Sequence, residues 1–169
     1  REEYNPDFER TTHPDAQWYP EAGFGLFIHW GINSVWGMGD ISWPMMKTMP
    51  GKLSIRHEQV GIGAHWVNIS PNRYWDLAKD FNPQNFDPDK ILKAAKEAGC
   101  TYAVFTTKHH DGFAMWPSKF GDLNTNTYMK GRDLVGEYVE ACRRQGLKVG
   151  LYFSPPDWYY NREHMSFCK

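Results

Sequence analysis

The sequence predicts an α/β fold with parallel strands, which a TIM-like (β/α)8 barrel and a doubly wound sheet would both satisfy. Two segments share one pattern, in which a helix ends at a glycine and an apolar strand follows: AAKEAGCTYAVFTT at 94–107 and ACRRQGLKVGLYFS at 141–154. The second glycine, Gly146, follows the first, Gly99, by 47 residues. Neither strand alternates polar and apolar residues, as is typical of parallel strands that are covered on both faces. The repeat therefore indicates consecutive βα units.

The first strand is expected at 25–29, a short apolar run rich in Phe and Ile between glycines. The following segment, 31–71, is rich in glycine, proline and methionine and has no sustained hydrophobic period. A long segment of this kind inside a compact domain is usually a functional loop. A short helix is then expected at 72–79.

The first repeated unit begins with a helix at 87–98. Asp87 is its acidic N-cap, Pro88 takes the first helical position, and Gly99 ends the helix. The apolar strand at 102–107 follows.

The second repeated unit begins with an amphipathic helix at 132–145, which ends at Gly146, and continues into a strand at 149–154. No GxGxxG or GxxxxGK[ST] sequence follows any strand, so a nucleotide-binding fold has no positive support. A complete (β/α)8 barrel needs about 250 residues, whereas these 169 residues supply about three βα units. We therefore expect 1–169 to be the N-terminal part of one larger catalytic domain.

The composition is that of a soluble globular protein, with 41% hydrophobic and 23% charged residues and a formal net charge of −1. No basic face is evident, which argues against nucleic-acid binding, and the longest apolar run, 22–28, is too short to cross a bilayer. The polar start at 1–14 does not resemble a signal peptide. Three cysteines without a CxxC spacing argue against a disulfide framework and a zinc site.

Polar side chains follow the expected strands at their C-terminal ends, which form the reactive edge of parallel α/β folds. His29 ends the first strand, and His109 and His110 follow the second. The third strand carries Tyr152 and ends at Ser154. If alternation turns the same face inward, we expect His29, His109 and Tyr152 to converge at the mouth of a barrel.

The 47-residue repeat also predicts how the last two strands pair. It places Phe105 and Thr107 in register with Tyr152 and Ser154.

Two chemistries would use such a cluster. Histidines at strand ends bind a catalytic metal in TIM-barrel hydrolases, which favours an HxH pair and a carboxylate. Here the first strand offers one histidine, and the adjacent rings of His109 and His110 cannot easily reach one ion from an extended strand. The alternative is a sugar pocket, in which imidazoles hydrogen-bond to hydroxyls and aromatic rings pack on the sugar face. Aromatic residues make up 16% of the chain, with eight Trp, and this favours the sugar pocket.

Three stretches carry a specific resemblance: FGLFIHWG at 24–31, KHHDGFAMW at 108–116 and RDLVGEYVEACRRQGLKVGLYFSPPDW at 132–158. Through them the chain resembles the N-terminal part of a glycoside hydrolase family 29 α-L-fucosidase. The resemblance implies a (β/α)8-like barrel, often followed by a C-terminal β-sandwich, and retaining hydrolysis of terminal α-L-fucose without a metal or other cofactor. It implies a fucosylated glycan as partner rather than nucleic acid or a membrane. It is compatible with a homo-oligomer and favours an extracytoplasmic location.

Carried over to this sequence, the resemblance implies that His29, His109 and His110 bind fucose hydroxyls. Tyr152 would approach the sugar near the nucleophile. Phe27 would help to form the apolar surface for the C5 methyl group of fucose.

The family also uses a tryptophan from the loop after the first strand, commonly in a Glu-Trp-Tyr setting. This chain departs from that setting, with SWP at 42–44 and HWV at 65–67. We assign the role to Trp43 because it keeps the loop position, with Trp66 as the alternative.

Under this resemblance the chain carries no catalytic carboxylate. A retaining glycosidase needs a nucleophile and a general acid about 5–5.5 Å apart, and both are expected beyond Lys169. Asp111 and Asp157 lie within the motifs, but we expect them to hold turns, and Asp111 could also orient an imidazole. A TIM-barrel metal-dependent hydrolase and a non-catalytic sugar-binding relative are the alternative functions.

Overall fold

The computed structural model describes residues 12–37, 40–46, 69–164 and 167. Three parallel strands form one sheet in the order β1-β2-β3. The strands are β1 (Gly25–Ile28), β2 (Tyr102–Lys108) and β3 (Lys148–Phe153). The helices and short 3-10 turns are η1 (Pro14–Ala16), η2 (Tyr19–Glu21), η3 (Ile32–Val35), η4 (Trp43–Met45), α2 (Pro71–Asp76), η5 (Leu77–Lys79), α3 (Pro88–Glu97), α4 (Thr125–Tyr128), α5 (Leu134–Gln145) and η6 (Arg162–His164).

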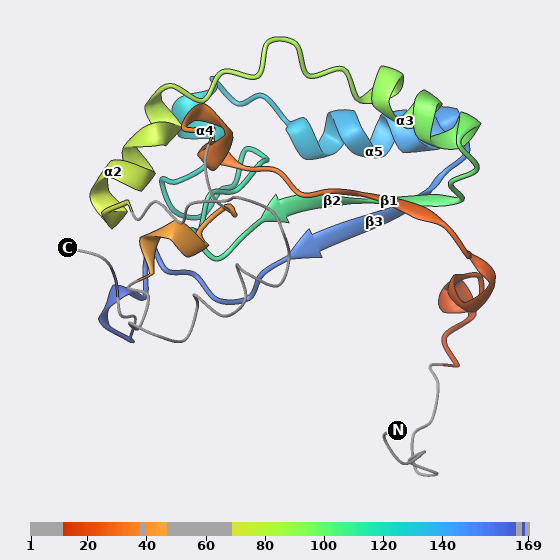
Figure 1. Ribbon diagram of the computed structural model, residues 1–169, viewed down its shortest axis with the longest axis horizontal. Coiled ribbons are helices and arrows are strands. Elements are labelled where there is room, and N and C mark those ends of the chain that lie inside the picture. Colours follow the sequence, from red (N-terminus) through yellow and green to blue (C-terminus); the bar gives the residue numbers. More distant parts are fainter. Residues whose placement is uncertain (1–11, 38–39, 47–68, 165–166, 168–169) are drawn as a thin grey trace, which may run out of the picture.

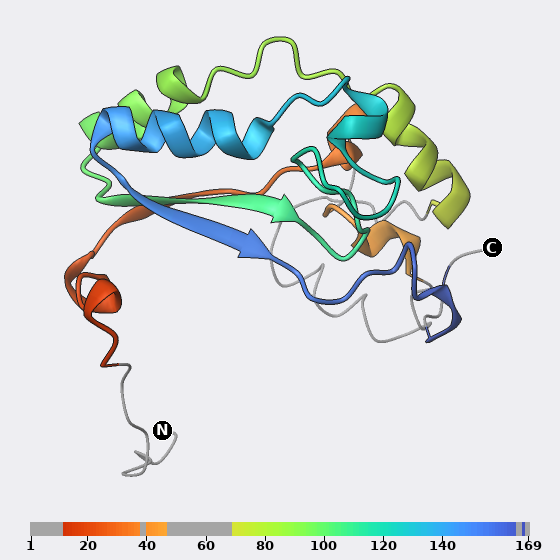
Figure 2. The ribbon, with the colours of Figure 1, turned by 180° about the vertical axis from the view of Figure 1, so that it is seen from behind.

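Two helices cover one face of this sheet. α3 and α5 lie side by side above the strands in Figure 1, and the view from behind in Figure 2 agrees. α2 and α4 lie beyond the C-terminal ends of the strands, where several loops also gather (Figure 1). Within the described residues, no helix is long and apolar enough to cross a membrane.

α3 begins and α5 ends with the signals predicted for them, and α5 begins at Leu134, two residues after the predicted start at 132. The Asp87 carboxylate accepts a hydrogen bond from the Lys90 amide at 3.0 Å and caps α3, which starts at Pro88. α5 is capped by Asp133, which accepts from the Gly136 amide at 2.8 Å. Its last turn ends at Gly146, whose φ of +65° is a left-handed conformation that favours glycine.

The core lies between these helices and the sheet. Phe105 of β2 is fully buried and stacks on Tyr138 of α5, with the ring centroids 5.0 Å apart. Leu92 of α3 is also fully buried in this core. Arg144 and Asp89 join the exposed sides of the two helices through an ion pair of 2.6 Å.

The pairing of β2 and β3 differs from the prediction by one residue. Phe105 lies opposite Leu151, and Thr106 lies opposite Tyr152. The register expected from the 47-residue repeat, with Phe105 opposite Tyr152, is therefore wrong. Strand pairing depends on the stagger between neighbouring strands, which the repeat length does not fix. A shift of one residue exchanges the two faces of a strand. In the observed register Thr106, rather than Phe105, therefore shares the face of Tyr152, and Phe105 lies on the other face, under α5.

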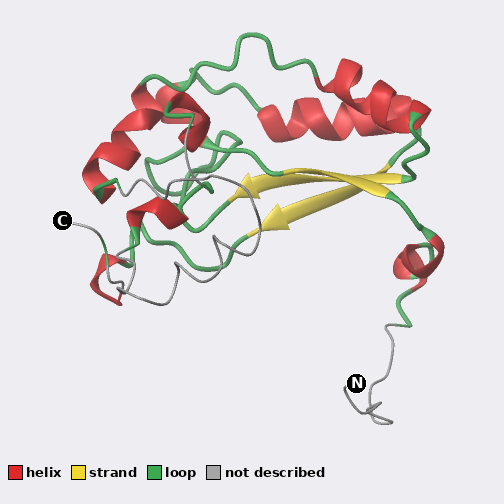
Figure 3. Ribbon diagram, in the orientation of Figure 1, coloured by secondary structure: helices red, strands yellow, loops and turns green. Residues whose placement is uncertain are grey.

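The two long helices lie on one side of the strands in Figure 3, and described residues cover the other face only in part, where Trp18 and Tyr19 pack against Tyr102. Phe27 on this face is 50% exposed. On the helix side, the edge strand β3 leaves Leu151 and Phe153 half exposed. The expectation that the strands are covered on both faces is met on the side of α3 and α5, and for the other face it stays a prediction. Apolar strands with one helix-covered face are suited to a barrel, whose interior is filled by side chains of its other strands.

Candidate functional site

The side chains predicted to converge lie together at the C-terminal edge of the sheet. His29 and His109 have ring centroids 5.2 Å apart, and the Tyr152 ring stacks on His109 at 5.8 Å. Phe27 lies 5.8 Å from both His29 and Tyr152, and His110 lies 4.3 Å from His109. These five side chains, the strand-end cluster, come from three neighbouring strands and the residues that follow them. Parallel strands bring them together because their carboxyl ends meet at one edge.

Trp43 of η4 extends this cluster on the side of His110. Its ring meets the rings of His110 and Trp158 edge-on, at 5.4 Å in both cases. Trp158 is buried, whereas Trp43 is 42% exposed. Trp43 is therefore an accessible aromatic face beside the histidines. The alternative residue, Trp66, lies outside the described residues.

His29 is held at both of its ring nitrogens. Nε2 lies 3.0 Å from a carboxylate oxygen of Asp40, and Nδ1 lies 3.3 Å from the hydroxyl of Thr106. The carboxylate can accept but not donate, so the proton of a neutral His29 ring lies on Nε2.

The paired histidines each have one bonded nitrogen. Nδ1 of His109 is hydrogen-bonded to the hydroxyl of Ser42, and Nδ1 of His110 to that of Ser154. In both rings Nε2 is the nitrogen left for a ligand.

Both paired imidazoles favour the neutral form. Burial, together with the neighbouring imidazoles of His110 and His29, lowers the pKa of His109 to about 4. Burial and the charge of Lys108 lower the pKa of His110. A neutral imidazole can both donate and accept a hydrogen bond. The cluster therefore combines uncharged hydrogen-bonding groups with an apolar, half-exposed ring at Phe27, which suits a neutral polyol that has one apolar group.

The two acidic residues of the motifs hold turns, as predicted. Asp111 is buried and accepts from the Phe113 amide at 2.9 Å and from the Tyr74 hydroxyl at 2.7 Å. These partners, rather than an imidazole, occupy its carboxylate. Burial raises the pKa of Asp111 to about 6.

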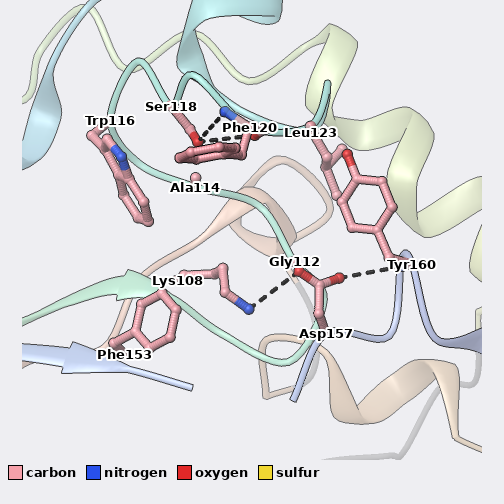
Figure 4. Close-up of a pocket in the computed structure, with 11 residues that line it drawn as sticks. Lys108, Gly112, Ala114, Trp116, Ser118, Phe120, Leu123, Phe153, Asp157 and Tyr160 are labelled. Carbon is pink, nitrogen blue, oxygen red and sulfur yellow. Dashed lines mark hydrogen bonds and ion pairs between the residues drawn. The ribbon is translucent and has the colours of Figure 1, made fainter. Parts of the chain in front are cut away.

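Asp157 holds the turn after β3. One of its carboxylate oxygens accepts from the amides of Tyr159 and Tyr160, at 3.2 and 3.3 Å, and the other pairs with Lys108 at 3.3 Å. This pair lines a pocket of about 460 Å³ beside β3, shown in Figure 4. The rings of Trp116 and Phe153 also line this pocket, and Asp157 already neutralises Lys108, so the pocket offers mainly apolar surface.

The described part of the chain has no evident metal-binding site. Across 12–37, 40–46, 69–164 and 167, no group of three or more His, Cys, Asp or Glu side chains is arranged to hold one. Cys100 and Cys142 are buried free thiols.

Sequence reasoning did not assign four residues that bond the histidines: Asp40, Ser42, Thr106 and Ser154. Ser154 was visible as a polar residue at a strand end, and Ser42 as the neighbour of Trp43. Asp40 lies in a loop without hydrophobic periodicity, so no local signal pointed to it.

The family model and the curated relatives that match this chain belong to one family. The model of the Alpha-L-fucosidase family matches residues 1–166. Tissue alpha-L-fucosidase of Mus musculus is 35% identical over 162 residues, which are 93% of this chain and 34% of the mouse protein. The chain thus spans about a third of the length of the curated relatives it matches.

Solved structures of alpha-L-fucosidases also match this chain. Alpha-L-fucosidase isoenzyme 1 from Paenibacillus thiaminolyticus matches with a TM-score of 0.64 and 38% identity, over 86% of this chain and 30% of that one. An alpha-L-fucosidase from Lactobacillus casei, in complex with alpha-L-fucose product, matches with a TM-score of 0.62 and 37% identity, over 86% of this chain and 42% of that one. The resemblance predicted from the histidine motifs is therefore confirmed, and the chain belongs to the alpha-L-fucosidase family.

Proposed function

We propose that this chain is the N-terminal part of the (β/α)8-like catalytic domain of a retaining exo-acting α-L-fucosidase, which hydrolyses terminal α-L-fucose. The observation that carries the proposal is the strand-end cluster, in which three histidines, a tyrosine and an exposed phenylalanine meet within one family-matched chain. The Lactobacillus casei relative was solved with fucose product, which supports fucose as the ligand class.

In this proposal each cluster residue has a role that its chemistry allows. His109 and His110 bind fucose hydroxyls through Nε2 of their neutral imidazoles. His29 does so by exchanging one of its present partners, Asp40 or Thr106, for a sugar hydroxyl. Phe27 packs against the C5 methyl group, and Tyr152 lies near the anomeric carbon. Trp43 forms the aromatic rim of the pocket and, by its edge-on contact with His110, also supports that ring.

The catalytic carboxylates then come from outside this chain. Asp111 and Asp157 are bound to turn amides and to Tyr74 or Lys108, so neither is free to act as nucleophile or acid. The exposed Phe27 on the face opposite the long helices supports closure of the three-stranded sheet by further strands of a barrel. The partner would be a fucosylated glycan, which is in keeping with an extracytoplasmic location, and a homo-oligomer is compatible with this arrangement.

The test is hydrolysis of p-nitrophenyl α-L-fucoside by the full-length protein, beside this chain alone. We expect hydrolysis by the full-length protein, none by the chain alone, and no loss after treatment with a chelator. Loss of activity with the chelator would favour the metal-dependent hydrolase. Fucose binding without hydrolysis would favour the non-catalytic sugar-binding relative. Hydrolysis by the chain alone would mean that a carboxylate within it is catalytic.

His29→Ala in the full-length protein tests the pocket itself. Because it removes hydrogen bonds to the sugar, we expect kcat/KM to fall roughly 10- to 100-fold. The matched control is His13→Ala, an exposed histidine whose ring accepts from the Asp15 amide in η1 and should leave kcat/KM unchanged. Equal activity of His29→Ala and wild type would refute the assignment of His29.

A further inference from the structure

Two buried serines from separate parts of the chain bond the paired histidines. Ser42, which precedes η4, is fully buried, and Ser154, which follows β3, is 2% exposed. Their hydroxyls are hydrogen-bonded to Nδ1 of His109 and Nδ1 of His110, respectively. Neither serine is adjacent in sequence to the histidine that it bonds, so the fold itself creates these contacts.

The direction of each bond follows from the position of the hydroxyl protons. A buried O–H group destabilises the folded state unless it donates a hydrogen bond to an acceptor. Among residues that the structure describes, the bonded ring nitrogen is the one acceptor for each of these hydroxyls. Ser42 and Ser154 therefore donate, and Nδ1 must be unprotonated to accept. The proton of each neutral ring then lies on Nε2.

Packing prevents the rings from escaping this arrangement. His109 is stacked on Tyr152 and lies 4.3 Å from the ring of His110, which in turn packs against Trp158 at 5.0 Å. A rotation that exchanged Nδ1 with a ring carbon would break the serine bond inside this packed group. Burial also lowers the pKa of both imidazoles, so the uncharged tautomer persists at neutral pH.

We propose that Ser42 and Ser154 are positioning residues that fix His109 and His110 as Nε2–H tautomers, so that the site presents two neighbouring hydrogen-bond donors. The sugar-binding part of this inference rests on the proposed function. The ligand would be a sugar that turns the lone pairs of two adjacent hydroxyl oxygens toward the pair. His29 is held as the same tautomer by other partners, because Thr106 can donate to its Nδ1 and Asp40 accepts at its Nε2, but this Nε2–H is bonded to Asp40 rather than presented to a ligand.

The direct test is a nitrogen-15 NMR spectrum of the full-length protein labelled at its histidine rings. Signals are assigned with His109→Gln and His110→Gln, and the chemical shifts report which nitrogen carries the proton. We expect Nδ1 of both rings in the unprotonated range and Nε2 in the protonated range. An Nδ1–H tautomer at both histidines in wild type would overturn the proposal without any serine variant.

The serine variants test the cause. Ser42→Ala should shift the His109 signals toward those of a ring that exchanges between its two tautomers, and leave the His110 signals nearly unchanged. Ser154→Ala should shift the His110 signals in the same way and leave those of His109 nearly unchanged. The matched control is Ser118→Ala, whose hydroxyl bonds the backbone of Phe120 away from the cluster (Figure 4) and should move neither histidine. Unchanged His109 and His110 signals in the folded serine variants would overturn the proposal.

Kinetics separates this inference from the proposed function. With p-nitrophenyl α-L-fucoside, Ser42→Ala and Ser154→Ala should each lower kcat/KM by roughly tenfold while Ser118→Ala does not. If wild type neither binds nor cleaves fucosides, the proposed function fails, and the spectra still decide the tautomers. If the spectra show the expected tautomers but the two serine variants keep full kcat/KM, the positioning role is overturned.

Discussion

Replacing Tyr74 by Phe should destabilise the fold by an amount that depends on pH. Tyr74 of α2 is fully buried, and its hydroxyl donates to a carboxylate oxygen of Asp111 at 2.7 Å. The indole of the neighbouring Trp75 donates to the backbone carbonyl of Asp111 at 3.0 Å. α2 thus holds the turn that carries the paired histidines.

The magnitude follows from the charge of the acceptor. Hydrogen bonds to ionised groups contribute about 1.5–3 kcal/mol, and those between neutral groups about 0.5–1.5 kcal/mol. Burial raises the pKa of Asp111 to about 6, while the Tyr74 hydroxyl, by binding the charged form, opposes that rise. We therefore expect Tyr74→Phe to cost about 2 kcal/mol at pH 8, where Asp111 is ionised, and about 1 kcal/mol at pH 5, where it is protonated.

The sign agrees with linkage between protonation and folding. The pKa of Asp111 in the folded state is above its ordinary value of 3.8, so the stability that this group contributes is present at low pH and lost as pH rises through about 6. Tyr74→Phe raises this pKa further, because it removes a donor to the charged form. The loss of stability in the variant is therefore larger above pH 6 than below it.

The assay is urea unfolding of the full-length protein and its Tyr74→Phe variant at pH 5 and pH 8, with wild type at each pH as the reference. The matched control is Tyr160→Phe on the surface, which removes a hydroxyl that donates to the Asp122 carboxylate and accepts from the Asp122 amide, both at 2.8 Å. We expect that control to cost less than about 1 kcal/mol, as exposed polar pairs do. An equal cost of Tyr74→Phe at both pH values would refute the reasoning about Asp111.

Three other changes should have measurable effects. Gly112→Ala should lower the free energy of unfolding in urea by about 1–3 kcal/mol, because φ is +89° and the added Cβ would lie 2.6 Å from the Asp157 carboxylate. The control Gly99→Ala has a similar φ of +95° but open space around the added Cβ, and it should cost only about 1 kcal/mol. Equal costs of the two variants would contradict the clash with Asp157. Thr125→Val should stabilise the protein by about 1 kcal/mol, since the buried Thr125 hydroxyl has no partner among the described residues, and a lower urea midpoint would show that the hydroxyl is bonded. Because the pKa of His109 is lowered to about 4, its contribution to stability is present above pH 6.5 and is lost as pH falls toward 4. His109→Gln should therefore make the free energy of unfolding less sensitive to acid over that range. An unchanged dependence of unfolding on pH would contradict this role of His109.

Local signals were sufficient to predict the two long helices and the three strands, whereas the short helix α4 was not predicted. An acidic cap, a proline at the first helical position and a terminal glycine each act within a few residues, so their effect can be inferred without tertiary structure. Asp87 caps α3 and Gly146 ends α5 as predicted. The convergence of His29, His109 and Tyr152 was also predictable, because parallel strands share one C-terminal edge.

Tertiary register and loop contacts could not be predicted. The spacing of the two βα units does not determine how far one strand is staggered against its neighbour, and the predicted register was therefore one residue off at Phe105. Asp40 and Ser42 reach the histidines from a loop without periodicity, so their roles depend on the path of that loop in space.

The most direct test of the account is a crystal structure of the full-length protein with α-L-fucose. We expect the sugar hydroxyls within hydrogen-bond distance of His29, His109 and His110, with Nε2 of the last two facing the ligand, and the C5 methyl group against Phe27. Fucose bound away from the strand-end cluster, or held there without contact to these histidines, would contradict the central claim.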